Sequence, residues 1–272
     1  MMQILTVANK EFQDGLRNRW LVSITLIFTV LSLGLTYFGA AASGSIGITS
    51  LSTTIASLAS LAVFLIPLIA LLLSYDSFVG EQESGTLLLL LTYPLSKSQL
   101  LLGKFFGQGA IIALAIFLGF GSSALLLYFQ MDSSQVIASF ALFIFSAVLL
   151  GLSFTAIAYL ISLSVSEKSK AAGFALITWF FFALAFDLAL LALLVGIDSD
   201  LGQQGLTQLM MLNPADIFRL VNLSGLDSSD VNGAIAIAIN ASMSQSQLIL
   251  SLLAWVAIPL SLAIFILKKK TL

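Results

Sequence analysis

The sequence predicts an all-α integral membrane protein with six transmembrane helices and both termini in the cytoplasm. Three observations lead to this fold class: an apolar composition, six apolar stretches of helical length, and an alternating placement of basic residues. Hydrophobic residues make up 59% of the 272 residues and charged residues 9%, and the mean hydropathy is +1.09. Soluble domains are roughly 45–50% apolar and about 25% charged. We therefore expect a single membrane domain over residues 1–272, with lipid as its main solvent and no nucleic acid partner.

Six apolar stretches are long enough to cross a bilayer as helices, at about 20 residues and 1.5 Å of rise per residue. They run from about 20 to 39, 51 to 75, 105 to 129, 136 to 163, 171 to 196 and 248 to 267. None contains Lys or Arg, and the only acid within them is Asp187.

The basic residues alternate strictly across these six stretches. Ten of the eleven fall on the side of the two termini, and Arg219 alone falls on the other side. Cytoplasmic loops carry the excess of Lys and Arg, so both termini are predicted to be cytoplasmic. The ten residues are Lys10, Arg17, Arg19, Lys97, Lys104, Lys168, Lys170, Lys268, Lys269 and Lys270.

The first apolar stretch raises the alternative of a cleaved signal peptide. Ala40, Ala41 and Ala42, followed by Ser43, would suit a small-residue cleavage site. However, the stretch and the charged leader before it are both longer than usual for such a signal, so we expect an uncleaved span. Cleavage would leave five spans and put the N-terminus outside.

Residues 1–19 precede the first span and have the pattern of an amphipathic cytoplasmic helix. Ile4, Ala8, Phe12 and Leu16 recur every four residues and form an apolar stripe. The basic residues of this segment are Lys10, Arg17 and Arg19.

The cytoplasmic loop at 76–104 predicts two short interfacial helices. Glu81 and Glu83 place negative charge near the start of the first, Pro94 interrupts it, and Ser96 can cap a second that starts at about Lys97. The alternative is an ordinary charged loop beside a span end. Downstream, Gly103-x-x-x-Gly107 is a lone small-residue motif that does not by itself predict a packing surface.

The outer loop at 197–247 is the only sizeable segment outside the membrane. Asn213 suits an N-cap and Pro214 the first helical position, so a short helix is predicted from there to about Leu223. Phe218 and Arg219 are residue types that anchor interfaces, so we expect residues 205–223 to contact an extracytoplasmic partner. The alternative is a helix that lies on the outer leaflet or closes a dimer from above.

Asp187 is costly inside the membrane, at roughly 2.5–3.5 kcal/mol on insertion scales. It either faces a possible cavity or a symmetry-related partner, or lies near the outer interface as a bonded carboxylate. Intramembrane aspartyl proteolysis needs a second membrane acid, which the spans lack.

Several other enzyme classes are excluded by residues that the sequence does not contain. There is no Cys and no His, which removes thiol chemistry, Ser–His hydrolysis and the usual zinc sites. We expect no metal site and no catalytic residue in this chain. The phosphate-binding motif G-x-x-x-x-G-K-[ST] is also absent, so any nucleotide hydrolysis must come from another chain.

The sequence pattern of this loop resembles the cytoplasmic loop of ABC type-2 permease subunits. The pattern is Glu81-x-Glu83-x-Gly85-Thr86-Leu87, followed by Thr92-x-Pro94-x-Ser96-Lys97. The resemblance implies a coupling helix that docks on an ATPase subunit, and an N-terminal elbow helix containing Lys10, Arg17 and Arg19. It further implies a second copy of the chain, two cytoplasmic ATPase subunits that bind ATP and Mg, and a bacterial inner membrane. The coupling residues so implied are Glu81, Glu83, Gly85, Thr86 and Lys97.

A narrower resemblance rests on residues 80–104 and on the outer segment 212–220. Both are similar to permeases of the ABC transporters that serve nitrous-oxide reductase maturation. This implies a periplasmic β-helical accessory protein and a role in assembling a copper–sulfide centre, with the cargo open between a sulfur species, another small molecule and a mechanical signal. The alternatives are an exporter of a lipid-like or antibiotic molecule and an ion-coupled secondary transporter, which would usually need paired membrane charges.

Overall fold

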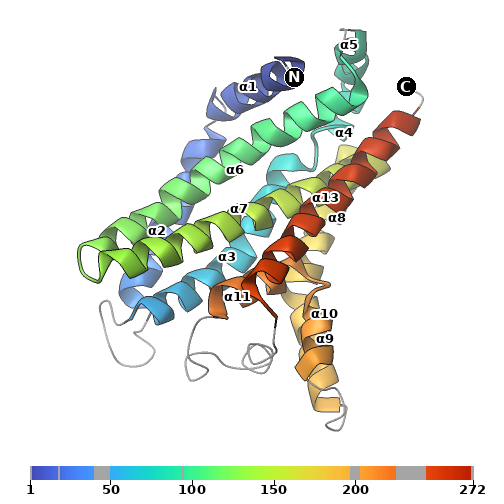
Figure 1. The fold of residues 1–272 in the computed structure, drawn as a ribbon. Helices are drawn as coiled ribbons and strands as arrows, with labels where there is room; N and C mark the ends of the chain where they lie inside the picture. Colours follow the sequence, from blue (N-terminus) through green and yellow to red (C-terminus); the bar gives the residue numbers. More distant parts are fainter. Residues whose placement is uncertain are drawn as a thin grey trace.

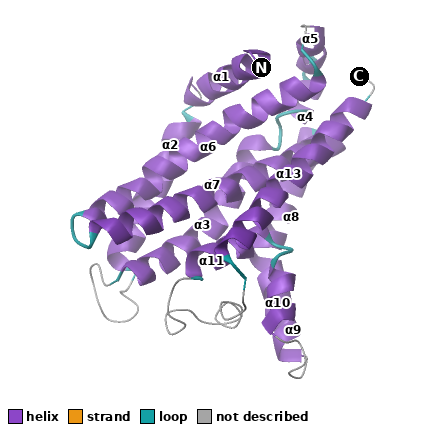
Figure 2. Cartoon of the chain, viewed as in Figure 1, coloured by secondary structure: helices purple, strands orange, loops and turns teal. Residues whose placement is uncertain are grey.

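The computed structural model is an elongated bundle of helices with both termini at the same end (Figure 1). The structure describes residues 2–17, 19–39, 50–92, 95–196, 203–224 and 243–270. Much of the predicted outer loop at 197–247 lies outside these residues. Within the described ranges the secondary structure is helical, without strands (Figure 2).

The six predicted spans are confirmed as helices long and apolar enough to cross a membrane. Several start earlier than the apolar pattern indicates, because their first turns are polar and capped. The spans are α2 (Trp20–Phe38), α3 (Leu51–Ser74), α6 (Lys97–Tyr128), α7 (Ser133–Ser164), the continuous α8 (Lys168–Phe180), η2 (Phe181–Ala185) and α9 (Phe186–Gly196), and α13 (Gln245–Lys269).

Side-chain caps set the starts of four spans. Ser96 accepts a hydrogen bond from the backbone of Gln99, whose side chain bonds back to Ser96, so α6 begins with a complete capping box as predicted for Ser96. Ser244 and Gln247 form the same box at α13. Ser50 caps α3 and Asp132 caps α7.

The bundle core lies where α3, α6 and α7 pack against one another. Small residues allow close approach: the space that a side chain at Gly119 of α6 would need is filled by Phe28 of α2, and a Cβ at Gly151 of α7 would lie 2.7 Å from Ile112. Span five and α13 lie on the outside of the bundle, and few of their residues are fully buried. These faces can therefore meet lipid or another chain.

The N-terminal helix α1 (Met2–Arg17) lies along the N-terminal part of α6, so this segment is helical as predicted. Gly103 and Gly107 of α6 allow this contact. A Cβ at Gly103 would lie 2.5 Å from Val7, and a Cβ at Gly107 would lie 2.7 Å from the carbonyl oxygen of Ala8. Gly103-x-x-x-Gly107, which does not by itself predict a packing surface, is therefore where α1 packs on α6.

The orientation across the membrane can be checked by labelling, because the natural chain has no cysteine. We expect Ser98→Cys, at the start of α6, to stay unlabelled by an impermeant maleimide in intact cells. Ser133→Cys, at the opposite end of the bundle, should be labelled. Labelling of residue 98 without cell lysis would contradict the predicted topology.

Candidate functional site

Two short helices connect spans two and three at the end of the bundle that carries the termini (Figure 1). Helix α4 is Val79–Glu83 and helix α5 is Thr86–Thr92. Gly85 turns the chain between them with φ of +73°, a conformation that glycine adopts without steric cost. The hydroxyl of Thr86 bonds to that of Ser84 at 2.9 Å, which steadies the turn.

The start of α4 is fixed on α7 by a buried serine. The Oγ atom of Ser162 accepts hydrogen bonds from the backbone N–H groups of Phe78 and Val79, both at 3.0 Å. These two amides would otherwise lack partners at a helix start. Helix α4 is therefore held in place by span four before any of its charged side chains is considered.

Glu81 of α4 points inward and binds a buried lysine of span three. Its Oε1 atom lies 2.7 Å from Nζ of Lys104, whose side chain is only 4% exposed. Glu11 of α1 lies 3.1 Å from the same nitrogen, and the Phe78 ring is 5.8 Å away. One cation thus connects α1, α4 and α6.

The next two residues of α4 contact two further elements. Nζ of Lys270, just after α13, donates a hydrogen bond of 2.7 Å to the side chain of Gln82, and partial burial lowers the pKa of this lysine. Glu83 accepts a 2.6 Å hydrogen bond from the backbone N–H of Lys168, the first residue of α8. Glu83 therefore caps span five from another part of the chain.

Three consecutive side chains of α4 consequently join it to three different spans, and we call this arrangement the α4 junction (Glu81, Gln82 and Glu83). Lys97, a further predicted coupling residue, extends it by donating a 2.7 Å hydrogen bond to the carbonyl of Lys270. The sequence did not identify Lys104 and Glu11 as the partners that meet at this site. A Lys at a span start is ordinary for a cytoplasmic end, so its burial could not be read from the sequence.

Replacing Glu83 with Ala is expected to lower the stability of the purified protein by about 1 kcal/mol, the usual loss for a helix cap. Glu167→Ala is the matched control, because Glu167 occupies the N-cap position of α8 but makes no capping hydrogen bond. Thermal unfolding in detergent measures both. An equal loss in the two variants would show that Glu83 does not cap α8.

A polar cavity of about 370 Å³ opens beside the junction. Two of its lining residues are hydrogen-bonded to each other, since Nε2 of Gln108 donates to Ser77 at 2.7 Å, and the buried Tyr159 donates to Oε1 of Gln108 at 3.0 Å. The hydrogen bonds therefore continue from the surface at this end of the bundle into the region between α6 and α7.

Of the predicted elbow residues, Lys10 lies in the middle of α1, Arg17 is its last residue, and Arg19 lies in the link to span one. Lys10 lies 3.2 Å from Asp14; burial lowers its pKa, but Glu11 and Asp14 outweigh that effect and raise it overall. Arg17 ends α1 and is exposed. Arg19 has φ of +57°, which turns the chain into α2.

At the opposite end, the predicted outer helix forms where expected, as α11 (Pro214–Leu223) with Asn213 as its N-cap. Its position corrects the expectation for Phe218, because α11 packs between α3, α7 and α13. The side chain of Phe218 is 0% exposed, with its ring 5.6 Å from that of Phe143. Packing against these three spans buries the helix, so Phe218 has no exposed surface to offer a partner.

Arg219 also binds to residues of its own chain. Its Nη1 atom lies 2.6 Å from Asp187 of span five and 3.0 Å from Asp216 of α11. Asp187 therefore faces an internal cation, and Arg219 is not an exposed anchor. Burial, followed by the charge of Asp187, raises the pKa of Asp216.

Asn213 completes this outer cluster, which consists of Asp187, Asn213, Asp216 and Arg219. Its side chain donates to Asp216 at 3.0 Å and to the carbonyl of Phe182 at 2.9 Å. Phe182 lies in η2, where the wider π-turn frees carbonyl groups from the normal helical pattern. The outer cluster therefore ties α11 to the irregular turn of span five.

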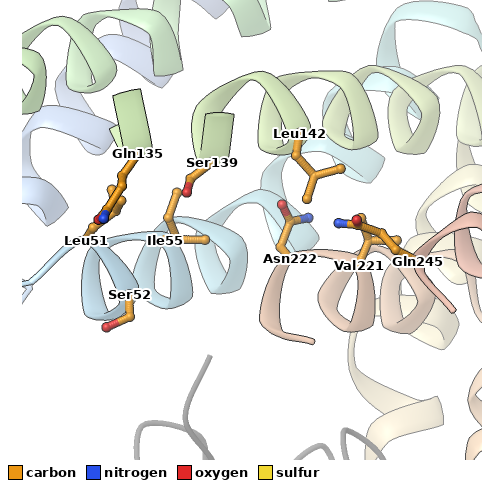
Figure 3. Close-up of a pocket in the computed structure, with 9 residues that line it drawn as sticks. All are labelled: Leu51, Ser52, Ile55, Gln135, Ser139, Leu142, Val221, Asn222 and Gln245. Carbon is orange, nitrogen blue, oxygen red and sulfur yellow. The ribbon is translucent and has the colours of Figure 1, made fainter. Parts of the chain in front are cut away.

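A pocket of about 360 Å³ lies at this end, between α7 on one side and α3 and α11 on the other (Figure 3). Its polar lining consists of amides and hydroxyls, among them Gln135, Ser139, Asn222 and Gln245, and the described lining includes no charged residue. Such a lining suits uncharged hydrogen-bonding groups better than ions.

Comparison with known proteins agrees with this architecture. Residues 5–272 match the family described as "ABC-2 family transporter protein". The chain is 52% identical over 266 residues to a "Probable ABC transporter permease protein NosY" of Pseudomonas aeruginosa, covering 97% of each chain. It is 51% identical over 274 residues to the protein of the same name from Stutzerimonas stutzeri, covering 99% of each. With six spans and a family match over nearly its full length, the chain belongs to the ABC-2 family of transporter proteins.

Proposed function

We propose that this chain is the permease subunit of an ABC transporter that serves nitrous-oxide reductase maturation in the bacterial inner membrane. ATP and Mg would be bound by two cytoplasmic ATPase subunits, and two copies of this chain would form the membrane unit. The similarity to two NosY permeases over nearly the whole chain supports the maturation role. It also disfavours the alternative of a general exporter of lipid-like or antibiotic molecules.

The α4 junction is the observation that carries this proposal. Helix α5 projects from the cytoplasmic end, and its Leu88 is 56% exposed (Figure 1). An exposed apolar side chain beside α4 suits insertion into a groove of an ATPase subunit. Because α4 is tied to α6, α8 and α13, displacement of this segment would act on three spans at once. Gly85 and Thr86 form the turn that sets α5 relative to α4.

On the outer side, we propose that a periplasmic β-helical protein contacts the surface around the uncharged pocket. The carboxamides of Gln135 and Gln245 are exposed there and can donate to and accept from a polypeptide backbone. The proposed outer contact therefore lies beside α11 and does not involve Phe218 or Arg219.

Co-purification tests the proposed ATPase contact. A Leu88→Asp variant is expected to reach the membrane in normal amount but to retain less than about a tenth of the ATPase subunit, because a charge would be buried in the groove. Gln13→Asp, which adds the same charge at an exposed position of α1, should retain the subunit. Equal retention by both variants would show that α5 does not dock the ATPase.

A further inference from the structure

Lys104 of α6, the buried cation that contacts the α4 junction, has two carboxylate partners on two different helices, Glu11 of α1 and Glu81 of α4. Glu11 is on α1, which is seated on α6 through Gly103 and Gly107, the residues that flank Lys104. Glu81 is on the short helix α4, which ends at the Gly85 turn. Glu11 therefore has to move with Lys104, whereas Glu81 moves with α4, a helix of 5 residues that is held by hydrogen bonds and ion pairs to its neighbours, among them those to Ser162, Lys168 and Lys270.

Burial makes this double pairing significant. Removing the counter-ion of a buried charge is strongly destabilising, because the charge is then neither paired nor hydrated. If Lys104 were paired with Glu81 alone, any displacement of α4 would leave a bare ammonium group between helices. With Glu11 also 3.1 Å away, the cation stays paired after Glu81 has left.

Glu81 is also the less completely satisfied of the two carboxylates. Its Oε2 atom is buried and has no hydrogen-bond partner among the described residues. The cavity beside the junction is lined by Glu81, Lys10, Asp76 and Lys168, so polar groups are within this space for a displaced side chain to meet. The contact of Glu81 with Lys104 is thus one that α4 can exchange.

We propose that Lys104 is a positioning residue of the transport cycle, with Glu81 as its exchangeable counter-ion and Glu11 as its permanent one. Lys104 holds α4 in the state described here and releases it when an ATPase subunit moves α4–α5. Because Glu11 stays paired with Lys104, the state in which α4 has been released does not contain an unpaired buried charge. This rests on the proposed function, because it needs a subunit that moves α4.

Neutralising each carboxylate then has a different effect on ATP hydrolysis. Glu81→Gln loosens α4 from span three, so hydrolysis by the assembled complex continues while nitrous-oxide reduction by the cells falls. Glu11→Gln leaves the described state paired but makes release of α4 costly, so hydrolysis itself falls by about tenfold, within the range of coupling between contacting groups.

The experiment measures both quantities, ATP hydrolysis per assembled complex and nitrous-oxide reduction by cells, for the two single variants. A double variant, Glu11→Gln with Glu81→Gln, leaves Lys104 unpaired and should lower the yield of folded complex more than the two single losses combined. Adding Lys104→Gln removes the bare charge and should restore that yield. Asp14→Asn is the matched control on α1, because Asp14 pairs with Lys10 and makes no ion pair with Lys104 among the described residues.

The outcomes separate this inference from the proposed function. Failure of the natural chain to retain any ATPase subunit would overturn the proposed function. If the complex forms but the two single variants lose hydrolysis and cell activity in the same ratio, the division of roles is wrong. Failure of Lys104→Gln to restore the double variant would show that the buried charge is not what the carboxylates stabilise.

Discussion

Replacing Gly107 with Ala is expected to separate α1 from span three and to abolish most of the activity of the assembled transporter. The new Cβ would lie 2.6 Å from Cβ of Glu11 and 2.7 Å from the carbonyl oxygen of Ala8. A backbone atom cannot move aside alone, so the whole of α1 must shift. Overpacking of this kind costs about 1–3 kcal/mol, and here it also withdraws Glu11 from Lys104.

Gly121→Ala on the same helix is the control for this substitution. A Cβ at Gly121 would have no atom within 4 Å, and alanine is the better helix former by about 1 kcal/mol. Thermal unfolding and ATP hydrolysis of the purified complex should therefore be unchanged or improved for Gly121→Ala and reduced for Gly107→Ala. Similar behaviour of the two variants would show that the close packing of α1 on α6 is unimportant.

Replacing Arg219 with Met is expected to give the largest loss of folded protein, because the buried Asp216 and the partly buried Asp187 would lose their shared cation. Breaking a buried ion pair from one side costs about 3–5 kcal/mol. Asp216 is 1% exposed, so water cannot replace Arg219 without opening the packing of α11. The measurement is the monodisperse fraction and the unfolding temperature after detergent extraction.

The same loss should be relieved by removing the charges that Arg219 neutralises. Adding Asp187→Asn and Asp216→Asn to Arg219→Met is expected to recover most of the folded yield, since no buried charge remains. Arg17→Met changes an exposed arginine and should have little effect. A triple variant as unstable as Arg219→Met would mean that packing of the arginine stem, and not its charge, holds α11.

The membrane architecture was predictable from the sequence because each of its signals is local. A span needs a run of apolar residues, and lipid satisfies such a run without any information about neighbouring helices. Caps are local as well: Ser96, Asn213 and Pro214 mark helix starts that the structure confirms. The sequence pattern of the loop from Glu81 to Lys97 was enough to indicate the family.

The partners of the charged residues were decided by tertiary structure alone. Glu81 and Lys104 are 23 positions apart and Glu83 and Lys168 are 85 apart, so their pairing depends on how whole helices lie together. Phe218 and Arg219 illustrate the same limit. A side chain that would anchor an interface looks identical in sequence to one that packs within its own chain. Burial distinguishes them, and burial of α11 results from the combined packing of α3, α7 and α13, which no local pattern encodes.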